Sequence, residues 1–339
     1  MQLSYNMIDL SLSRNLVTTN GRKPKNFRNI IVTLHNHGLT GIGSAVPAYD
    51  YGTNESSLAH FLDKSTDILT GYDLEKRHLL FDLLIGEVGG QWSAFAAIDM
   101  AIHDLLGKQA NLPLFQYLGL DSRKIPYTAA TIGICEPDVA VIEAQPYLNW
   151  QTLKLKMGSC PDYDRVLAIR SAFTGCLWVD GNGAFPAKDA LDIAKKLAAC
   201  GVDVLEQPVA PGQYDLLREI RTETSLLLIA DEDIHGPESV LALAGCVHGI
   251  NIKLLKCGGI KRAIDMITLA RYSGLKIVLG CKVENSVGVT ATAHLAGLAD
   301  YVDLDGHLGI NGDPYLGVMI GSDGKICLPL TPGLGLETI

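Results

Sequence analysis

From about residue 126 onward, short runs of β-forming residues alternate with segments whose apolar residues recur at helical spacing. The β-forming runs are YTAATIGI, TLKLKM, LWVD, DVLEQP, LLLIAD, INIKLL, KIVLG and YVDLD. Segments such as ALDIAKKLAAC and RAIDMITLARYSG lie between them and place their apolar residues on one helical face. This alternation predicts parallel β/α units, and eight strands favour a closed barrel. An open doubly wound sheet is the alternative, but no glycine-rich dinucleotide fingerprint follows the first strand.

The first part of the chain has a different pattern. Residues 1 to about 50 contain β-forming runs, among them Ile30–Gly38, and a long helix is predicted from about Ser93. We therefore predict an α/β protein with an N-terminal α+β domain over residues 1–123 and a (β/α) barrel over residues 124–319. The C-terminal segment, about 320–339, is expected to pack back on the N-terminal domain.

Composition narrows the classes of function. The 339 residues include 28 Lys and Arg against 37 Asp and Glu, which gives a net charge of −9 and no basic stripe for nucleic acid. No uncharged apolar run of about 20 residues is present, so no membrane span is predicted. The N-terminus lacks the pattern of a signal peptide, and the eight cysteines include no CxxC pair. We therefore expect a cytoplasmic protein with free thiols.

Charged residues lie at the ends of the predicted barrel strands, where β/α barrels carry their catalytic groups. Lys154 and Lys156 share one face of the second strand because they are two residues apart. The next four strands add one charged residue each, in the order Asp180, Glu206, Asp231 and Lys253. A single carboxylate at such a place is most often a helix cap or part of a loop salt bridge. Three in consecutive units predict a shared site, because burying three like charges is costly unless a cation neutralises them.

The residue types indicate a reaction. Three carboxylates without Cys or His favour Mg²⁺, with Mn²⁺ as a substitute. Such an ion can bind a substrate carboxylate and stabilise the enediolate that forms when the α-proton leaves. Lys156 and Lys253, on opposite sides of the ring, are candidates for the two bases of a 1,1-proton transfer. Lys154 is interpreted as tuning charge or binding the carboxylate, and Lys256 competes with Lys253 for the sixth-strand role.

The motifs KLKMG, VDGNG, LEQP, ADED and NIKLLKCGG, with IHDLLGKQANLPLFQYLG before them, resemble the muconate-lactonizing branch of the enolase superfamily. The superfamily pairs a Lys or His base with Mg²⁺. The resemblance implies a modified TIM barrel with an N-terminal capping domain. The mandelate racemase branch has a His at the end of the seventh strand, whereas this chain has LGCKVEN there.

The eighth strand discriminates between reactions within that branch. Its sequence YVDLDGH places Asp303 and Asp305 two residues apart, which resembles dipeptide epimerases, where such a pair binds the α-ammonium of the substrate. Two carboxylates suit a cation and repel a dicarboxylate. The alternative is a pair of loop caps after a strand. The resemblance also implies that Thr131, Lys154 and Cys281 contact the substrate.

The hypothesis is therefore an isomerase that inverts the α-carbon of the C-terminal residue of a dipeptide of the L-Ala-D/L-Glu type. An acidic second residue is favoured if one of four cations (Arg22, Lys23, Lys25 and Lys282) reaches the pocket. N-acylamino acid racemization and o-succinylbenzoate synthesis are the alternatives within the branch, and a non-catalytic metal-binding barrel is a remote one. Barrels of this kind often assemble, so a homo-oligomer is left open.

Overall fold

The N-terminal part of the chain folds as an antiparallel sheet covered by helices. The structure is a computed structural model, and it describes residues 1–339 except 15 and 20–24. Strands β1 (Gln2–Leu12), β2 (Asn26–Asn36) and β3 (Leu39–Ala45) pair in that order. Ile30, Val32 and Leu34 of β2 are fully buried against the helices α1 (Glu55–Leu69), α2 (Arg77–Glu87) and α3 (Trp92–Gln109). The predicted N-terminal strands and the long helix are confirmed.

Helix α3 lies directly on β3. A Cβ atom at Gly43 would come within 1.9 Å of the carbonyl oxygen of Ala97, so only glycine permits this approach. Gly41 makes a similar approach to Ala101. The helix is buried over most of its length because the barrel covers its other side.

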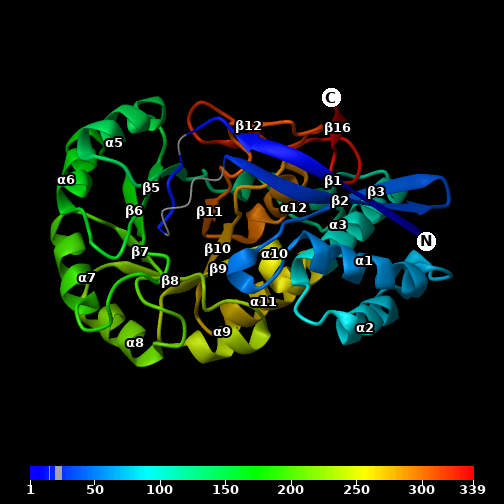
Figure 1. The fold of residues 1–339 in the computed structure, drawn as a ribbon, viewed down its shortest axis with the longest axis horizontal. Helices are drawn as coiled ribbons and strands as arrows, with labels where there is room; N and C mark the ends of the chain where they lie inside the picture. The colour runs from blue at the N-terminus through cyan, green and yellow to red at the C-terminus, as the bar shows by residue number, and fades with distance from the viewer. Residues whose placement is uncertain (15, 20–24) are drawn as a thin grey trace.

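Eight parallel strands among the described residues form the predicted barrel. They are β4 (Ala130–Ile132), β5 (Thr152–Lys156), β6 (Cys176–Asp180), β7 (Val204–Glu206), β8 (Leu227–Ala230), β9 (Gly249–Ile252), β10 (Lys276–Gly280) and β11 (Tyr301–Asp303). The helices between them are α5 (Pro137–Ala144), α6 (Tyr163–Ala172), α7 (Ala190–Ala199), α8 (Tyr214–Glu223), α9 (Pro237–Leu243), α10 (Leu254–Cys257), α11 (Ile260–Tyr272) and α12 (Ser286–Ala293). Figure 1 shows α5 to α9 as an arc around one side of the strands, with α1 and α2 on the other.

A parallel bridge between Thr128 and Val302 closes the barrel between its first and last strands. The amide of Ala129 donates to the carbonyl oxygen of Val302 at 3.1 Å. Thr128 Oγ1 also accepts a hydrogen bond from the amide of Leu304, at 2.8 Å. The barrel predicted from the strand pattern is therefore confirmed.

Side chains of the barrel strands alternate between the outer helices and the interior. Leu153 and Leu155 of β5 belong to the core under the helices, which leaves Lys154 and Lys156 for the interior face. Trp178 of β6 packs inside with aliphatic residues of other strands, and Asp180 follows it two residues later. Apolar side chains thus fill one end of the barrel, and charged side chains occupy the end where the strands finish.

The end of the chain returns to its beginning. Strand β12 (Ile310–Asn311) pairs with β1 and becomes the edge of the N-terminal sheet. Further on, the amide of Leu334 donates to Asp104 Oδ1 of α3 at 2.7 Å. The division of the chain at about residue 123 stays a prediction. Among the described residues, no helix is long and apolar enough to cross a membrane.

Candidate active site

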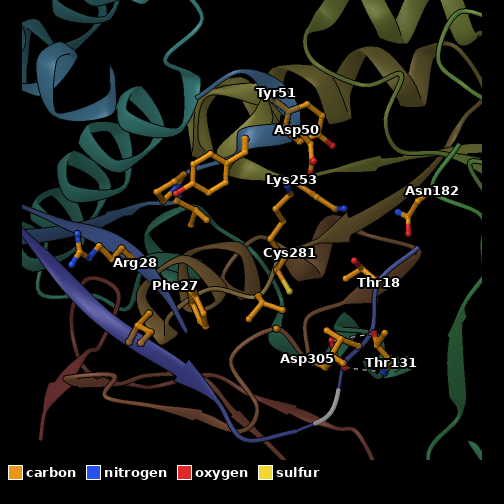
Figure 2. Close-up of a pocket in the computed structure, with 18 of the residues that line it drawn as sticks. Thr18, Phe27, Arg28, Asp50, Tyr51, Thr131, Asn182, Lys253, Cys281 and Asp305 are labelled. Atoms are coloured by element: carbon orange, nitrogen blue, oxygen red, sulfur yellow. Dashed lines mark hydrogen bonds and ion pairs between the residues drawn. The ribbon is translucent and has the colours of Figure 1, made fainter. Parts of the chain in front are cut away.

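A cavity of about 1590 Å³ lies at the carboxyl ends of the barrel strands and is lined by residues of both the barrel and the N-terminal region. Figure 2 shows Asp50 and Tyr51 from the N-terminal region near Lys253 of the barrel. Six of the residues predicted from sequence line this cavity: Thr131, Lys156, Lys253, Cys281, Asp303 and Asp305. The other four, Lys154, Asp180, Glu206 and Asp231, are completely or almost completely buried next to it.

Lys154 is the centre of a buried cluster of carboxylates. Its Nζ lies 2.6 Å from Glu206 Oε2, 2.7 Å from Asp303 Oδ2 and 3.0 Å from Asp180 Oδ2. Burial alone would lower the pKa of Lys154, but the surrounding carboxylates outweigh it and raise the pKa well above its usual value. These contacts make Lys154 the cation at the centre of the carboxylate cluster.

Asp231 is contacted by two lysines. Lys253 Nζ lies 2.6 Å from Asp231 Oδ2, and Lys256 donates to Asp231 Oδ1 and to its carbonyl oxygen. Burial would raise the pKa of Asp231, but these two cations hold it well below its usual range. Of the two lysines, Lys253 lines the cavity, and Lys256 is not among the lining residues.

Lys156 is held from three sides. Its Nζ donates to Asp180 Oδ2 at 2.7 Å and to Asn182 Oδ1 at 3.3 Å. The guanidinium of Arg165 donates to the backbone carbonyl oxygens of Lys156 and Gly133, which fixes the end of β5. Thr19 Oγ1 lies 2.8 Å from Asn182 Oδ1 and donates to the carbonyl oxygen of Met157 at 2.9 Å, so a segment preceding β2 reaches the same place.

The three buried carboxylates have the right chemistry for a divalent cation. Asp180 and Glu206 end β6 and β7, Asp231 follows β8 directly, and all three are fully buried. Burial and the neighbouring Asp180 raise the pKa of Glu206 to about 8, and its Oε2 receives no hydrogen bond although Lys154 is close. Crowded carboxylate oxygens of this kind are hard ligands that suit Mg²⁺.

In the structure, lysines hold the positions between these carboxylates. No three His, Cys, Asp or Glu side chains in the described part of the chain stand together as a ready metal-binding group. Lys154 bridges Asp180 and Glu206, and Lys253 contacts Asp231. A cation held by all three carboxylates would compete with these ammonium groups for the same oxygens. The donor set therefore has the chemistry to fit a metal.

Asp303 and Asp305 both line the cavity, but each already has partners. Asp305 Oδ2 accepts from the amide of Thr131 and pairs with Arg14 Nη1, both at 2.8 Å (Figure 2 shows the contact with Thr131). Asp303 pairs with Lys154, and its carbonyl oxygen accepts from Cys281 Sγ at 3.3 Å. The predicted residues are thus brought together, and Arg14 joins them.

Lys282 lies at the cavity wall. Its Nζ lies 4.7 Å from the centre of the Tyr51 ring and 3.6 Å from Asp50 Oδ2. Burial and the nearby Lys253 lower the pKa of Lys282. Lys25 is exposed and is not among the lining residues, and Arg22 and Lys23 lie outside the described residues.

Known protein families match both parts of the chain. Residues 140–338 match the enolase C-terminal domain-like family, and residues 16–119 match the N-terminal domain of mandelate racemase and muconate lactonizing enzyme. This chain belongs to the enolase superfamily. The family resemblance seen in the sequence motifs is therefore confirmed.

Relatives of this superfamily member include epimerases. It is 34% identical over 313 residues to the L-Ala-D/L-Glu epimerase of Bacteroides thetaiotaomicron, and the match covers 91% of this chain and 80% of the relative. The dipeptide epimerase of Enterococcus faecalis V583, solved with Mg and L-Leu-L-Tyr, superposes with a TM-score of 0.93 at 30% identity and 99% coverage of both chains. The Methylococcus capsulatus dipeptide epimerase, solved with Mg and L-Arg-D-Lys, has a TM-score of 0.91 at 28% identity, and the match covers 99% of this chain and 98% of that one.

Several residues of this superfamily site escaped prediction from the sequence. Asn182 and Glu232 lie within the motifs VDGNG and ADED, and a hydrogen bond of 2.9 Å from Asn182 Nδ2 to Glu232 Oε1 joins them. Asn182 has a positive φ of 43°, a conformation that asparagine tolerates better than most residues. The motifs thus contained a signal for both residues. Arg14 and Tyr51 come from segments whose sequence contains no signal that places them at the site.

Proposed function

We propose that this chain is a Mg²⁺-dependent dipeptide epimerase that inverts the α-carbon of the C-terminal residue of its substrate. The observation that carries the proposal is the placement of Lys156 and Lys253 in one cavity. They lie at the ends of β5 and β9, which are the second and sixth strands of the barrel. Strands four apart in an eight-stranded barrel face each other, so the two lysines approach a bound α-carbon from opposite sides. One lysine removes the α-proton and the other returns a proton to the opposite face.

Asp180, Glu206 and Asp231 are the residues that would hold Mg²⁺, with Mn²⁺ as a substitute. The bound ion would supply Lewis-acid stabilisation of the substrate carboxylate as its α-carbon loses the proton. Lys154, in contact with two of these carboxylates, limits the negative charge that the ion must neutralise. The complexes of related epimerases with Mg support this assignment.

Asp303 and Asp305 are proposed to receive the free α-ammonium of the dipeptide. A carboxylate offers about four acceptor positions, so the contacts of Lys154 and Arg14 leave room for a further donor. Thr131 and Cys281 line the same part of the cavity and are proposed to contact the substrate there. These contacts orient the dipeptide with its C-terminal residue towards the two lysines.

Lys282 supports a preference for an acidic second residue, as in L-Ala-D/L-Glu. Its ion pair with Asp50 spans 3.6 Å and is longer than a tight charge-assisted contact. A substrate carboxylate would therefore improve the surroundings of this desolvated ammonium group. The L-Ala-D/L-Glu epimerase among the relatives is consistent with this preference.

A second candidate follows from one observation. The ion pair between Arg14 and Asp305 neutralises one of the two carboxylates at the ammonium site. A less negative site tolerates a neutral N-acyl group better, as N-acylamino acid racemization requires.

A cytoplasmic location and assembly into a homo-oligomer stay predictions from the sequence.

Exchange of the α-proton in D₂O tests the proposal. With Mg²⁺ and L-Ala-L-Glu, the enzyme should place one deuterium at the α-carbon of the Glu residue, detected by mass spectrometry, and yield the D-Glu isomer. Lys156→Ala and Lys253→Ala should both abolish inversion, whereas the exposed Lys195→Ala should not. Exchange in N-acyl amino acids without exchange in any dipeptide would replace the proposal with the second candidate. Exchange in neither class would refute both.

A further inference from the structure

The backbone that follows Lys253 is held by the N-terminal helix α3. Lys253 is the N-cap of the short helix α10, and two glycines with positive φ, Gly258 and Gly259, connect α10 to α11. Helices α10 and α11 both contact α3. Lys253 therefore lies at the start of a short helix that leads into a tight turn, and α3 packs against both helices that the turn connects.

Asp99 of α3 makes the central contact. Its side chain is fully buried, and Oδ2 accepts hydrogen bonds from the amides of Ile260 and Lys261, the first two residues of α11. The N-cap of α11 is Gly259, which has no side chain to satisfy these amides. Asp99 therefore caps a helix of the barrel from a different region of the chain, and its charge is favourable at that helix end.

A second contact reinforces the same turn. The guanidinium of Arg262 lies 4.2 Å from the centre of the Trp92 ring, at the start of α3. Arg262 Nε donates to the carbonyl oxygen of Cys257, the last residue of α10. A Cβ atom at Gly259 would lie 2.4 Å from Asp99 Oδ2, so the turn and the helix fit closely.

The other lysine has different support. Arg165 and Asn182, both from the barrel, and Thr19 hold the end of β5 around Lys156. Within the described part of the chain, no hydrogen bond of these residues involves α3. Loosening the contact between α3 and α11 should therefore disturb one base and spare the other.

We propose that Asp99 is a positioning residue that fixes Lys253 through the α10–α11 turn. This inference rests on the proposed two-lysine epimerization. A displacement of a catalytic group by about 1 Å can cost about 100-fold in rate. Loss of the Asp99 charge should therefore slow the proton transfers of Lys253 selectively.

Isomer-specific exchange tests the inference. Each lysine removes the α-proton of one isomer of the substrate. The Lys156→Ala and Lys253→Ala variants identify which lysine acts on which isomer, because each variant retains exchange of one isomer only. In Asp99→Asn, exchange of the isomer served by Lys253 should fall at least tenfold relative to exchange of the other isomer. A role confined to stability would lower both rates in proportion.

Asp104→Asn is the matched control. Asp104 is a buried carboxylate on the same helix, but it accepts from the amides of Ile42 and Leu334 and does not contact α11. Its variant should leave the ratio of the two exchange rates unchanged. If Asp99→Asn fails to fold, Arg262→Met loosens the same turn from a partly exposed position and should produce the same bias.

An unchanged ratio in the foldable variant overturns the positioning role while leaving the epimerase intact. Absence of exchange of either isomer in the unmodified enzyme overturns the proposed function and this inference together.

Discussion

The ammonium nitrogen of Lys154 lies 2.7 Å from Asp303 Oδ2, and this contact joins the second strand of the barrel to the eighth. The same nitrogen contacts Asp180 and Glu206. One buried cation therefore serves both the proposed metal site and the proposed ammonium site. Its removal would take one cation from three carboxylates at once, and within the described part of the chain Asp180 alone of them would keep a second lysine, Lys156.

Lys154→Met should destabilise the protein strongly when metal is absent. Breaking a buried ion pair typically costs about 3–5 kcal/mol because the remaining charge is unpaired. In the presence of Mg²⁺ the loss should be smaller, because a bound cation replaces part of the missing charge. Urea unfolding with EDTA and with Mg²⁺ measures both values. Lys195→Met, which breaks an exposed ion pair with Glu223, should change the stability by less than about 1 kcal/mol. Equal losses with and without Mg²⁺ would show that no metal binds near Lys154.

Removal of the metal should abolish α-proton exchange. EDTA-treated enzyme should regain activity with Mg²⁺ or Mn²⁺, and saturation at about 100 times the dissociation constant should add about 2.7 kcal/mol to the free energy of unfolding. In Asp231→Asn, added metal should neither restore activity nor raise the free energy of unfolding. Full activity after exhaustive chelation would contradict the assignment of these carboxylates.

Lys282→Met should reduce the preference for acidic dipeptides. A hydrogen bond to a charged group contributes about 1.5–3 kcal/mol, so kcat/KM for Ala-Glu should fall about 10- to 100-fold relative to Ala-Leu. Lys25→Met, which changes an exposed lysine outside the cavity, provides the comparison. An unchanged ratio in Lys282→Met would remove the basis for an acidic substrate.

His294 should make stability fall in mild acid. Its Nδ1 accepts from the amide of Phe115, and its Nε2 contacts the carbonyl oxygen of Leu334. Burial lowers the pKa of His294 from 6.5 to about 4. Between these two pKa values the imidazole is protonated in the unfolded chain and neutral in the folded chain. The free energy of unfolding therefore falls as the pH drops from about 6.5 towards 4. Between pH 7 and 5 the loss from this residue is about 2 kcal/mol.

Urea unfolding of the wild type and of His294→Gln at pH 7 and 5 measures this loss. The amide of glutamine can accept and donate without titrating, so the variant should lose less stability over the same interval. Parallel losses in the two proteins would assign the acid sensitivity to other groups.

Much of the site was predictable because its signals are local. The two-residue spacing of Lys154 and Lys156 fixes their common face, and the position of Asp180 at the end of a strand fixes its place on the ring. Such features depend on neighbouring residues and on the strand pattern alone. The barrel and the N-terminal sheet were predictable on the same basis, whereas the family followed from the resemblance of the motifs.

Features that depend on distant pairs were not predictable. Arg14 and Asp305 are 291 residues apart, and their ion pair follows from how the N-terminal region rests on the barrel mouth. Asp99 and Ile260 are 161 residues apart, and nothing near Asp99 in the sequence indicates a helix that lacks a cap. The contact of Lys256 with Asp231 belongs to the same class, because the turn after β9 decides where that side chain points.

Strand β12, which forms one edge of the N-terminal sheet, is synthesised late. Ile310 and Asn311 pair with Leu12 and Ser11, so this end of β1 has an open edge on the ribosome until residue 311 has been made. An open strand edge is a template for pairing with other chains. Forms that end before residue 310 should therefore expose the backbone of Ser11 and Leu12 to pairing with other chains.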